Sequence, residues 1–183
     1  MKNNRTPILT KLKAYKGSDA NEESMRLQLI EFVETHEDCF ERTQLAGHVN
    51  GSAWIIDKDR EFALLTHHAK LNKWLQLGGH SDGDPDTLNV ATREANEESG
   101  LKSVVAVSPE IFDIDIHPIP ARGDEPEHFH YDIRFMFYAD KDEPFVISEE
   151  SKDLAWVKLD KISELTDSES MLRMVRKSNN FGK

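Results

Sequence analysis

Hydrophobic and polar residues alternate most clearly over residues 128–138. The hydrophobic members of this run are Phe129, Tyr131, Ile133, Phe135 and Phe137, and the polar ones between them are His128, His130, Asp132 and Arg134. Successive side chains of a β-strand point to opposite faces of its sheet. The run therefore predicts a strand with one face in the core and one polar face.

Shorter runs predict further strands. Residues 47–56 and 62–65 are β-rich and are separated by the turn-like residues 57–60, so together they predict a hairpin. Residues 74–77 predict a short third strand that stops at Gly78-Gly79, where the chain can turn freely. The remaining segments are extended stretches within 101–119, a polar loop over 121–127, and two short strands over 145–147 and 154–157.

Helical spacing occurs before and among these strands. Over residues 22–38, hydrophobic side chains recur at helical spacing among charges and predict an amphipathic helix. Pro85 suits the first turn of a second helix, Asp84 is its predicted N-cap, and Gly100 suits a left-handed cap after Ser99. Two more helices are predicted over residues 159–165 and 168–178.

The order of these elements predicts an α/β fold with α+β character. Strands interleaved with one central helix and flanking helices indicate an α/β/α sandwich around a mixed sheet, with additional N-terminal and C-terminal helices. A chain of 183 residues fits one domain of ordinary size. We expect residues 1–43 to form a helical extension that packs on a domain of residues 44–183.

Charge and composition exclude several function classes. The formal net charge is −11 and no Lys/Arg-rich run occurs, so a general nucleic-acid binder is not expected. The same acidity would repel a small diphosphate unless a cation lay between them. No apolar run has the length of a signal peptide or a membrane span, and the single cysteine, Cys39, agrees with a reducing compartment. We therefore expect a cytoplasmic protein without membrane contact.

Three glutamates of the central helix form the strongest candidate site. At about 100° per residue, Glu94, Glu97 and Glu98 share a sector of roughly 100° on the helix surface. Like charges at this spacing cost about 0.2–0.5 kcal/mol per pair, so a neutralising partner is expected. Oxygen ligands suit Mg²⁺ or Mn²⁺. A solvated acidic helix face is the competing interpretation of three glutamates alone.

The residues around the glutamates resemble the Nudix box. Gly79 precedes Arg93-Glu94-Ala95 by the expected spacing, and Glu97-Glu98 and Gly100-Leu101 follow in order. The family usually has a glutamate where this chain has Pro85, flanked by Asp84 and Asp86, and either aspartate could replace that glutamate as the partner of Arg93. The resemblance extends over roughly residues 47–165, toward a bacterial Nudix subgroup of mostly unassigned substrate.

The resemblance implies a mechanism and assigns its residues. Glu94, Glu97, Glu98 and the carbonyl of Gly79 would bind Mg²⁺ or Mn²⁺, which would polarise the phosphoryl group and activate a water. Two candidates remain for the base that takes the water's proton: Glu94, or a later glutamate, Glu149 or Glu150. Arg93 is expected to orient a glutamate. These residues form the predicted catalytic set Arg93, Glu94, Glu97, Glu98 and Glu150.

Flanking polar residues are candidates for substrate contact. His80 stands beside the motif glycine, and His130, Asp132 and Arg134 occupy the polar face of the alternating strand. A solvated or hydrogen-bonded sheet face is the alternative for that strand. His67 and His68 are at least as suited to a structural role, although histidines flanking the box could also bind a transition metal.

The sequence thus predicts a Nudix diphosphohydrolase acting on a nucleoside diphosphate linked to another moiety. Two alternatives stay open: a nucleotide-sensing Nudix-like module without catalysis, and an enzyme resembling isopentenyl-diphosphate isomerase, which would need a cysteine near the box, whereas Cys39 lies far from it. The partner expected is a small molecule. Loops set specificity in this fold, so the sequence leaves the identity of the substrate open. It also leaves the oligomeric state open, and a homodimer is one possibility.

Overall fold

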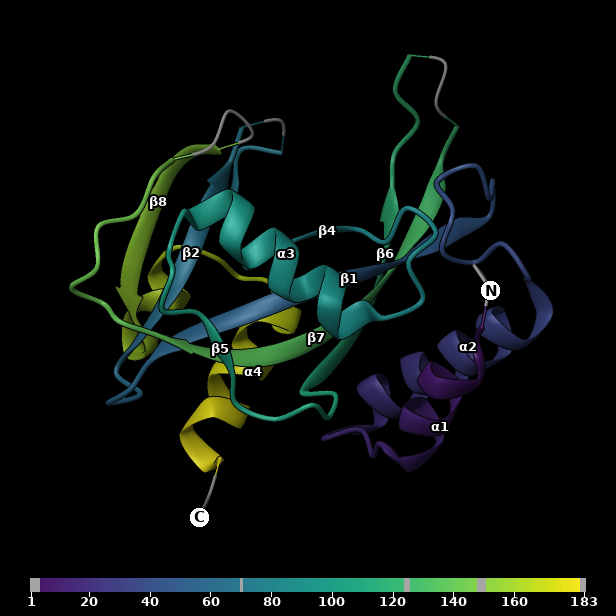
Figure 1. Cartoon of the computed structure of the whole chain (residues 1–183), viewed down its shortest axis with the longest axis horizontal. Coiled ribbons are helices and arrows are strands. Elements are labelled where there is room, and N and C mark those ends of the chain that lie inside the picture. Colours follow the sequence, from purple (N-terminus) through teal and green to yellow (C-terminus); the bar gives the residue numbers. More distant parts are fainter. Residues whose placement is uncertain (1–3, 70, 124–125, 148–150, 182–183) are drawn as a thin grey trace.

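A curled mixed β-sheet forms the centre of the molecule in the computed structural model, which describes residues 4–69, 71–123, 126–147 and 151–181 (Figure 1). Within these ranges the strands are β1 Gly47–Asp57, β2 Phe62–His68, β3 Lys73–Leu75, β4 Leu77–His80, β5 Val105–Ala106, β6 Asp113–Ile119, β7 His128–Ala139 and β8 Ser151–Lys158. The helices are α1 Thr6–Ala14, α2 Ala20–Thr35, α3 Thr87–Ser99, the 3₁₀ helix η1 Leu159–Glu164, and α4 Glu169–Asn180.

Strand β1 organises the sheet. It forms the predicted hairpin with β2, in which Ile55 lies opposite Leu64, and it pairs antiparallel with β4. Along its whole length it pairs in parallel with β7, and β7 in turn pairs antiparallel with β6 and β5. Strands β3 and β8 complete the other side by pairing with β2. One parallel pair among antiparallel neighbours confirms the predicted mixed sheet.

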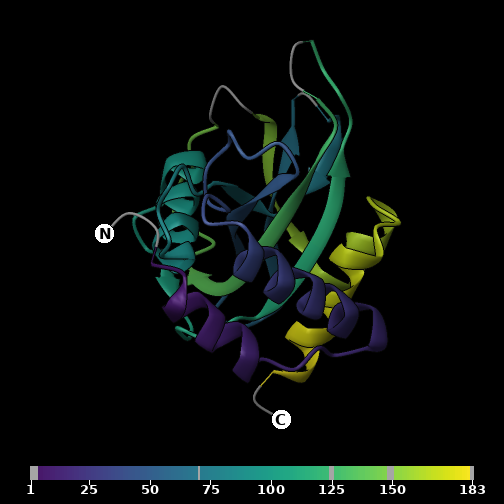
Figure 2. The same ribbon diagram turned by 90° about the vertical axis from the view of Figure 1, so that its right-hand side faces the viewer.

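Helices cover both faces of the sheet. Figure 2 shows α3 on one side of the strands and α4 on the other, with α1 and α2 crossing in front. The side chains of β1 alternate accordingly: Ile55 joins the core cluster under α3, whereas Trp54 joins a second cluster with Met174 of α4. The layered α/β/α arrangement predicted from the sequence is therefore confirmed.

Helix α3 approaches β1 closely because Gly51 has no side chain. A Cβ at this position would lie 2.5 Å from the backbone oxygen of Thr87 and 2.8 Å from Cβ of Val90. Ala91 and Ala95, on the same face of the helix, are fully buried. Small residues on both elements thus set the distance from the helix to the sheet, and with it the position of the glutamates.

The N-terminal helices pack on the rest of the chain. Leu12 of α1 and Leu29 of α2 are fully buried in the same cluster as Ile55. Arg5 donates a hydrogen bond to the carbonyl of Val33, which ties α1 to α2. These contacts join the N-terminal helices to the core of the sheet, and the division into an extension of residues 1–43 and a domain of residues 44–183 stays a prediction.

A buried network of charges connects α2, β6, β7 and α4. Its members, here called the ionic cluster, are Tyr15, Glu22, Asp113, Asp115, Arg134, Arg173 and Lys177. Asp113 is fully buried and accepts hydrogen bonds from Arg134, Arg173 and Lys177 at 2.8 to 3.1 Å. Buried charges of this kind are tolerated because each finds an opposite charge.

The ionic cluster should make stability fall in acid. Burial acts to raise the pKa of Glu22, but hydrogen bonds from Lys177, the Ser18 backbone and Tyr15 outweigh it and lower the pKa to about 2. A carboxyl with a depressed folded-state pKa stabilises the protein above its ordinary pKa of 4.5, and this contribution is lost as pH falls from there toward 2. Urea unfolding between pH 7 and 2 should show a smaller loss for Glu22→Gln than for the wild-type chain. Parallel pH profiles for the two would contradict this assignment.

Some sequence-based predictions of local structure are wrong. Helix α3 begins two residues later than expected, because Asp86, not Asp84, accepts the capping hydrogen bond from the Asn89 backbone N–H. The predicted strand over residues 74–77 is expected to stop at Gly78-Gly79, but both glycines belong to β4, which pairs with β1. Residues 145–147 form no strand, and helix α1 has no counterpart among the predicted elements.

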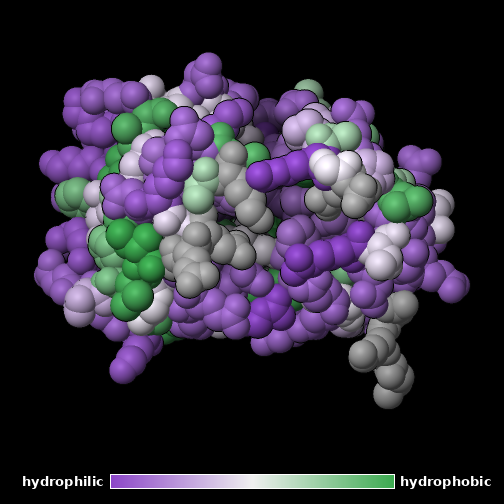
Figure 3. Space-filling view, turned by 90° about the horizontal axis from the view of Figure 1, so that it is seen from above, coloured by the Kyte–Doolittle hydropathy of each residue, from purple (hydrophilic) through white to green (hydrophobic). Residues whose placement is uncertain are grey.

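The molecular surface is largely hydrophilic on the face seen from above the view of Figure 1 (Figure 3). Across the part of the chain that the structure describes, no helix combines the length and apolarity needed to span a bilayer.

Candidate active site

Helix α3 presents its glutamates to strand β4. The helix ends at Gly100, whose φ of 68° is the left-handed conformation predicted for its cap. Glu97 is exposed, the Glu94 side chain is 18% exposed and Glu98 is 7% exposed. The three carboxylates therefore run from solvent at Glu97 to the interior at Glu98, and they are not simply a solvated face.

Two of the glutamates contact the strand that precedes the helix. The backbone N–H of Gly78 donates a 2.9 Å hydrogen bond to Oε2 of Glu98. The Glu94 carboxyl lies directly over Gly79, where a Cβ would stand 2.5 Å from the carboxyl carbon. Only a glycine leaves room for this carboxyl. The structure thus brings together Gly79, Glu94 and Glu98, with Glu97 one helical turn beyond Glu94.

Arg93 holds the corner between β4 and α3. Its Nη2 donates hydrogen bonds to the carbonyl of His80 at 2.9 Å and to Oε1 of Glu94 at 2.8 Å. The hydrogen bond to Glu94 raises the pKa of the Arg93 guanidinium, which is the sign of a mutually stabilising pair. The suggestion that Asp84 or Asp86 pairs with Arg93 is wrong, since these carboxylates accept hydrogen bonds from the start of α3 instead.

The polar face of β7 is buried. Arg134 is 2% exposed and forms ion pairs of 3.1 Å with Asp113 and 3.2 Å with Asp115. Asp132 is 4% exposed and accepts a hydrogen bond from Asn50. These two side chains already have partners within the fold, so the hydrogen-bonded sheet face describes them better than a surface open to substrate.

Histidines gather at the start of the same face. The ring of His48 lies 4.7 to 5.0 Å from those of His80, His128 and His130, measured between centroids. His130 lies 5.2 Å from His80 and from His128, and 5.6 Å from His117. Burial is the main cause that lowers the pKa of His48 and of His80 to about 4 and that of His130 to about 3. Their rings are therefore neutral at pH 7. The sequence singles out His80 and His130, but it gives no comparable signal for His48.

Other candidates are placed away from this corner or outside the described residues. Cys39 is fully buried, and burial raises the pKa of its thiol to about 12, which is unsuited to nucleophilic or acid chemistry at neutral pH. His67 stacks on Trp74 at 5.0 Å, a structural contact. Glu149 and Glu150, the candidate bases from a later loop, lie outside the described residues.

Comparisons with known proteins agree with this geometry. A family model described as the NUDIX domain matches residues 47–177. A NUDIX-family hydrolase from Clostridium perfringens is 21% identical with a TM-score of 0.54, and the alignment covers 73% of this chain and 97% of that one. No curated protein sequence matches the chain.

Two further solved structures share the fold. The Ap4A hydrolase of C. elegans, in a binary complex, is 15% identical with a TM-score of 0.52, covering 74% of this chain and 96% of that one. The E. coli dihydroneopterin triphosphate pyrophosphohydrolase is 14% identical with a TM-score of 0.54, covering 73% and 93%. At these identities the likeness concerns the fold and leaves the substrate open.

Proposed function

The chain belongs to the NUDIX hydrolase family, and from this premise we propose that it cleaves the phosphoanhydride bond of a nucleoside diphosphate linked to another moiety. The observation that carries the proposal is the meeting of Glu94 and Glu98 with the backbone of Gly78 and Gly79, beside the exposed Glu97. An acidic face serving only solubility would not need two of its carboxylates enclosed against a glycine strand.

The donor set fits a hard divalent cation. Glu94, Glu97 and Glu98, with the carbonyl of Gly79, would hold Mg²⁺ or Mn²⁺, since all of these donors are oxygen and most are charged. A Cβ at Gly79 would occupy the space beside the Glu94 carboxyl, so the glycine leaves this space available for a cation. When bound, such an ion supplies charge neutralisation for the phosphate oxygens and lowers the pKa of a coordinated water.

Each protein group has a distinct task in this proposal. Arg93 anchors the Glu94 carboxylate to the carbonyl end of β4 through its two hydrogen bonds. The Arg93 guanidinium already holds the Glu94 carboxylate at 2.8 Å, so we assign Glu94 to holding the cation and not to acting as the base. This favours Glu150 as the group that takes the proton from the attacking water.

Contact with a part of the substrate away from the cleaved bond is assigned to two histidines on the sheet face opposite the glutamates. His80 follows Gly79 directly, and His130 lies beside it with ring centroids 5.2 Å apart. Neutral imidazoles can donate hydrogen bonds to the base, sugar or phosphate of a small molecule. Arg134 and Asp132 are instead assigned to support of the sheet. The substrates in the names of two of the similar solved structures, Ap4A and dihydroneopterin triphosphate, show that substrates differ widely on this fold.

The proposal is tested by incubating the chain with Mg²⁺ or Mn²⁺ and a panel of nucleoside diphosphate derivatives, and by resolving the products chromatographically. In ¹⁸O-labelled water, cleavage of the phosphoanhydride should place one label in a phosphate product. Binding of a panel member without any cleavage would contradict catalysis and indicate a nucleotide-sensing module. Isomerised diphosphate without released phosphate groups would indicate the isomerase chemistry.

Substituting Gly79 should lower activity with little loss of fold. The Cβ of Gly79→Ala would displace the Glu94 carboxyl from its place over the strand, and misplacement by about 1 Å can cost about 100-fold in rate. Steady-state kinetics with the best panel substrate measures this, and circular dichroism checks the fold. Gly123→Ala is the control for activity, because a Cβ there would have no other described atom within 4 Å, although its φ of 59° should lower stability. Equal kcat/KM for both variants would show that the corner at Gly79 is not used.

A further inference from the structure

The histidine group contains nitrogen donors outside the oxygen site of the glutamates, namely those of His48 and His128 together with His130, which is also proposed to contact substrate. We propose that His48, His128 and His130 bind a divalent transition-metal ion of the zinc class through three imidazole nitrogens. This site would differ from the oxygen site of Glu94, Glu97 and Glu98 in both chemistry and position. It does not depend on the proposed hydrolytic function.

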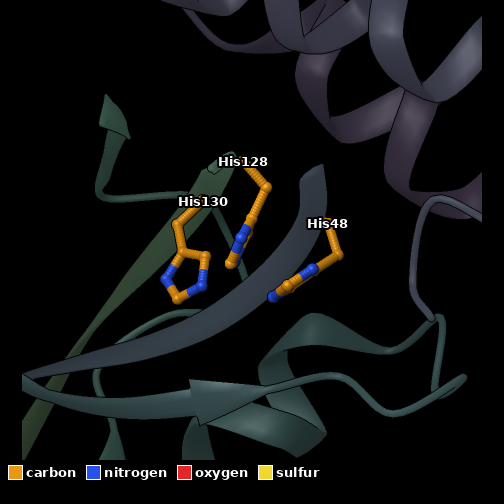
Figure 4. A group of neighbouring side chains, drawn as sticks. All are labelled: His48, His128 and His130. Carbon is orange, nitrogen blue, oxygen red and sulfur yellow. The ribbon is translucent and has the colours of Figure 1, made fainter. Parts of the chain in front are cut away.

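The geometry of the three side chains carries the inference. One ring nitrogen from each residue lies within 4.8 Å of those of the other two. Figure 4 shows the rings of His48 from β1 and of His128 and His130 from β7 pointing toward a common space. Three nitrogens around a tetrahedral ion with Zn–N bonds of about 2.0–2.1 Å are about 3.3 Å apart, so small rotations of these rings would complete the arrangement.

His48 shows why a ligand belongs there. Its side chain is 2% exposed, and neither Nδ1 nor Nε2 has a hydrogen-bond partner among the described residues. A buried polar group without a partner costs about 1–3 kcal/mol. An imidazole confined in this way, next to two others, is stabilised if it donates a lone pair to a metal ion.

His128 is already oriented as a ligand. Its Nδ1 lies 2.9 Å from the carbonyl oxygen of Pro126, which can only accept, so Nδ1 carries the proton and Nε2 carries the lone pair. Metal-binding histidines commonly donate their second N–H to a backbone carbonyl in this manner.

The site lies on the face of the sheet opposite α3. In the register of β1 and β4, Gly51 pairs with Gly79 on the side of the glutamates, whereas Asn50 pairs with His80 on the other side. His48 and His130 are partners in the parallel pairing of β1 with β7 and share that second face. Since His130 is only half-buried, an ion can reach the group from its side. Imidazole donors select zinc, copper or nickel over magnesium.

A second group, His117, His130 and Asp132, also has donor atoms within 4.8 Å. Asp132 already accepts a hydrogen bond from Asn50, and Nδ1 of His117 lies 3.2 Å from Asp115. These donors have partners, whereas His48 has none among the described residues. The observations therefore favour the trio that contains His48.

The test measures Zn²⁺ binding to the untagged full chain by equilibrium dialysis and elemental analysis, in the presence of millimolar Mg²⁺. We expect one Zn²⁺ per chain in the wild-type protein and in Glu97→Gln. We expect binding at least about 100-fold weaker in His48→Gln and His130→Gln, since loss of an outer partner alone typically costs about 10–100-fold. His117→Gln is the matched control, a neighbouring histidine outside the trio, and should retain the ion.

Thermal unfolding gives an independent result, because an ion that binds the folded state raises the unfolding temperature. Zn²⁺ should raise it for the wild-type chain and His117→Gln but not for His130→Gln. If His48→Gln does not fold, the half-buried His130→Gln decides. Zn²⁺ below one equivalent in the wild-type chain, binding retained in His130→Gln, or binding lost in His117→Gln or Glu97→Gln would each overturn the assignment.

Discussion

Glu97→Gln is expected to lower kcat/KM by about 10²–10⁴-fold while the protein stays folded. The side chain is exposed on α3, one turn beyond Glu94, so the substitution removes one charge and little packing. Losing a charged ligand of the proposed cation weakens stabilisation of the charge that develops on the phosphate, and removal of one such group typically costs this much. Hydrolysis of the best substrate at saturating Mg²⁺, with the free energy of unfolding measured alongside, checks both parts.

The control for this variant is Glu31→Gln, an exposed glutamate on α2. It makes the same chemical change on a helix surface away from the corner and should leave kcat/KM unchanged. The two variants should unfold within about 0.5 kcal/mol of the wild-type chain, as is usual for surface positions. Full activity of Glu97→Gln would remove the glutamate face from the mechanism, and excess Mn²⁺ restoring part of a lost rate would support a role in holding the cation.

Asp113→Asn should destabilise the protein by about 3–5 kcal/mol. The fully buried carboxylate accepts hydrogen bonds from Arg134, Arg173 and Lys177, and the amide cannot neutralise these cations. Removing one member of a buried ion pair leaves uncompensated charge in a region of low polarity, which costs more than the pair itself contributes. Urea unfolding at pH 7 measures the loss.

Asp142→Asn is the matched control for this experiment. Its side chain is 90% exposed and lies 3.5 Å from Lys141, so its ion pair is screened by solvent. Its unfolding free energy should stay within about 0.5 kcal/mol of the wild-type value. A loss below about 1 kcal/mol for Asp113→Asn would mean that the cations of the ionic cluster find water or other partners in the variant.

The sequence predicts those parts of the fold that are set by periodicity. The hairpin of β1 and β2, the long strand β7 and the end of α3 at Gly100 follow from alternation, turn residues and a left-handed cap, all of which are local properties. The start of α3 is misplaced because Asp84 and Asp86 are equally good capping residues on either side of Pro85. Which of the two aspartates caps the helix depends on how the loop before α3 packs, and the sequence does not show this.

The candidate site is predictable where a spacing encodes it and not where distant strands create it. Gly79, Arg93 and the three glutamates belong to one continuous motif. The buried partners of Arg134 come from β6, and no local pattern marks Asp113 or Asp115 as its neighbours. His48 resembles an ordinary strand residue in the sequence, because its proximity to His130 depends on the parallel pairing of β1 with β7.

That parallel pairing also bears on how the chain reaches its structure. Asn50 and Asp132 are neighbours in the sheet although 82 residues separate them along the chain. The hairpins can form early because short loops connect their strands. The pairing of β1 with β7 forms later, because closing the long segment between them costs more conformational entropy. Folding should therefore be slow for a chain of this size. Until the two strands join, the edges of both are open to pairing with other chains.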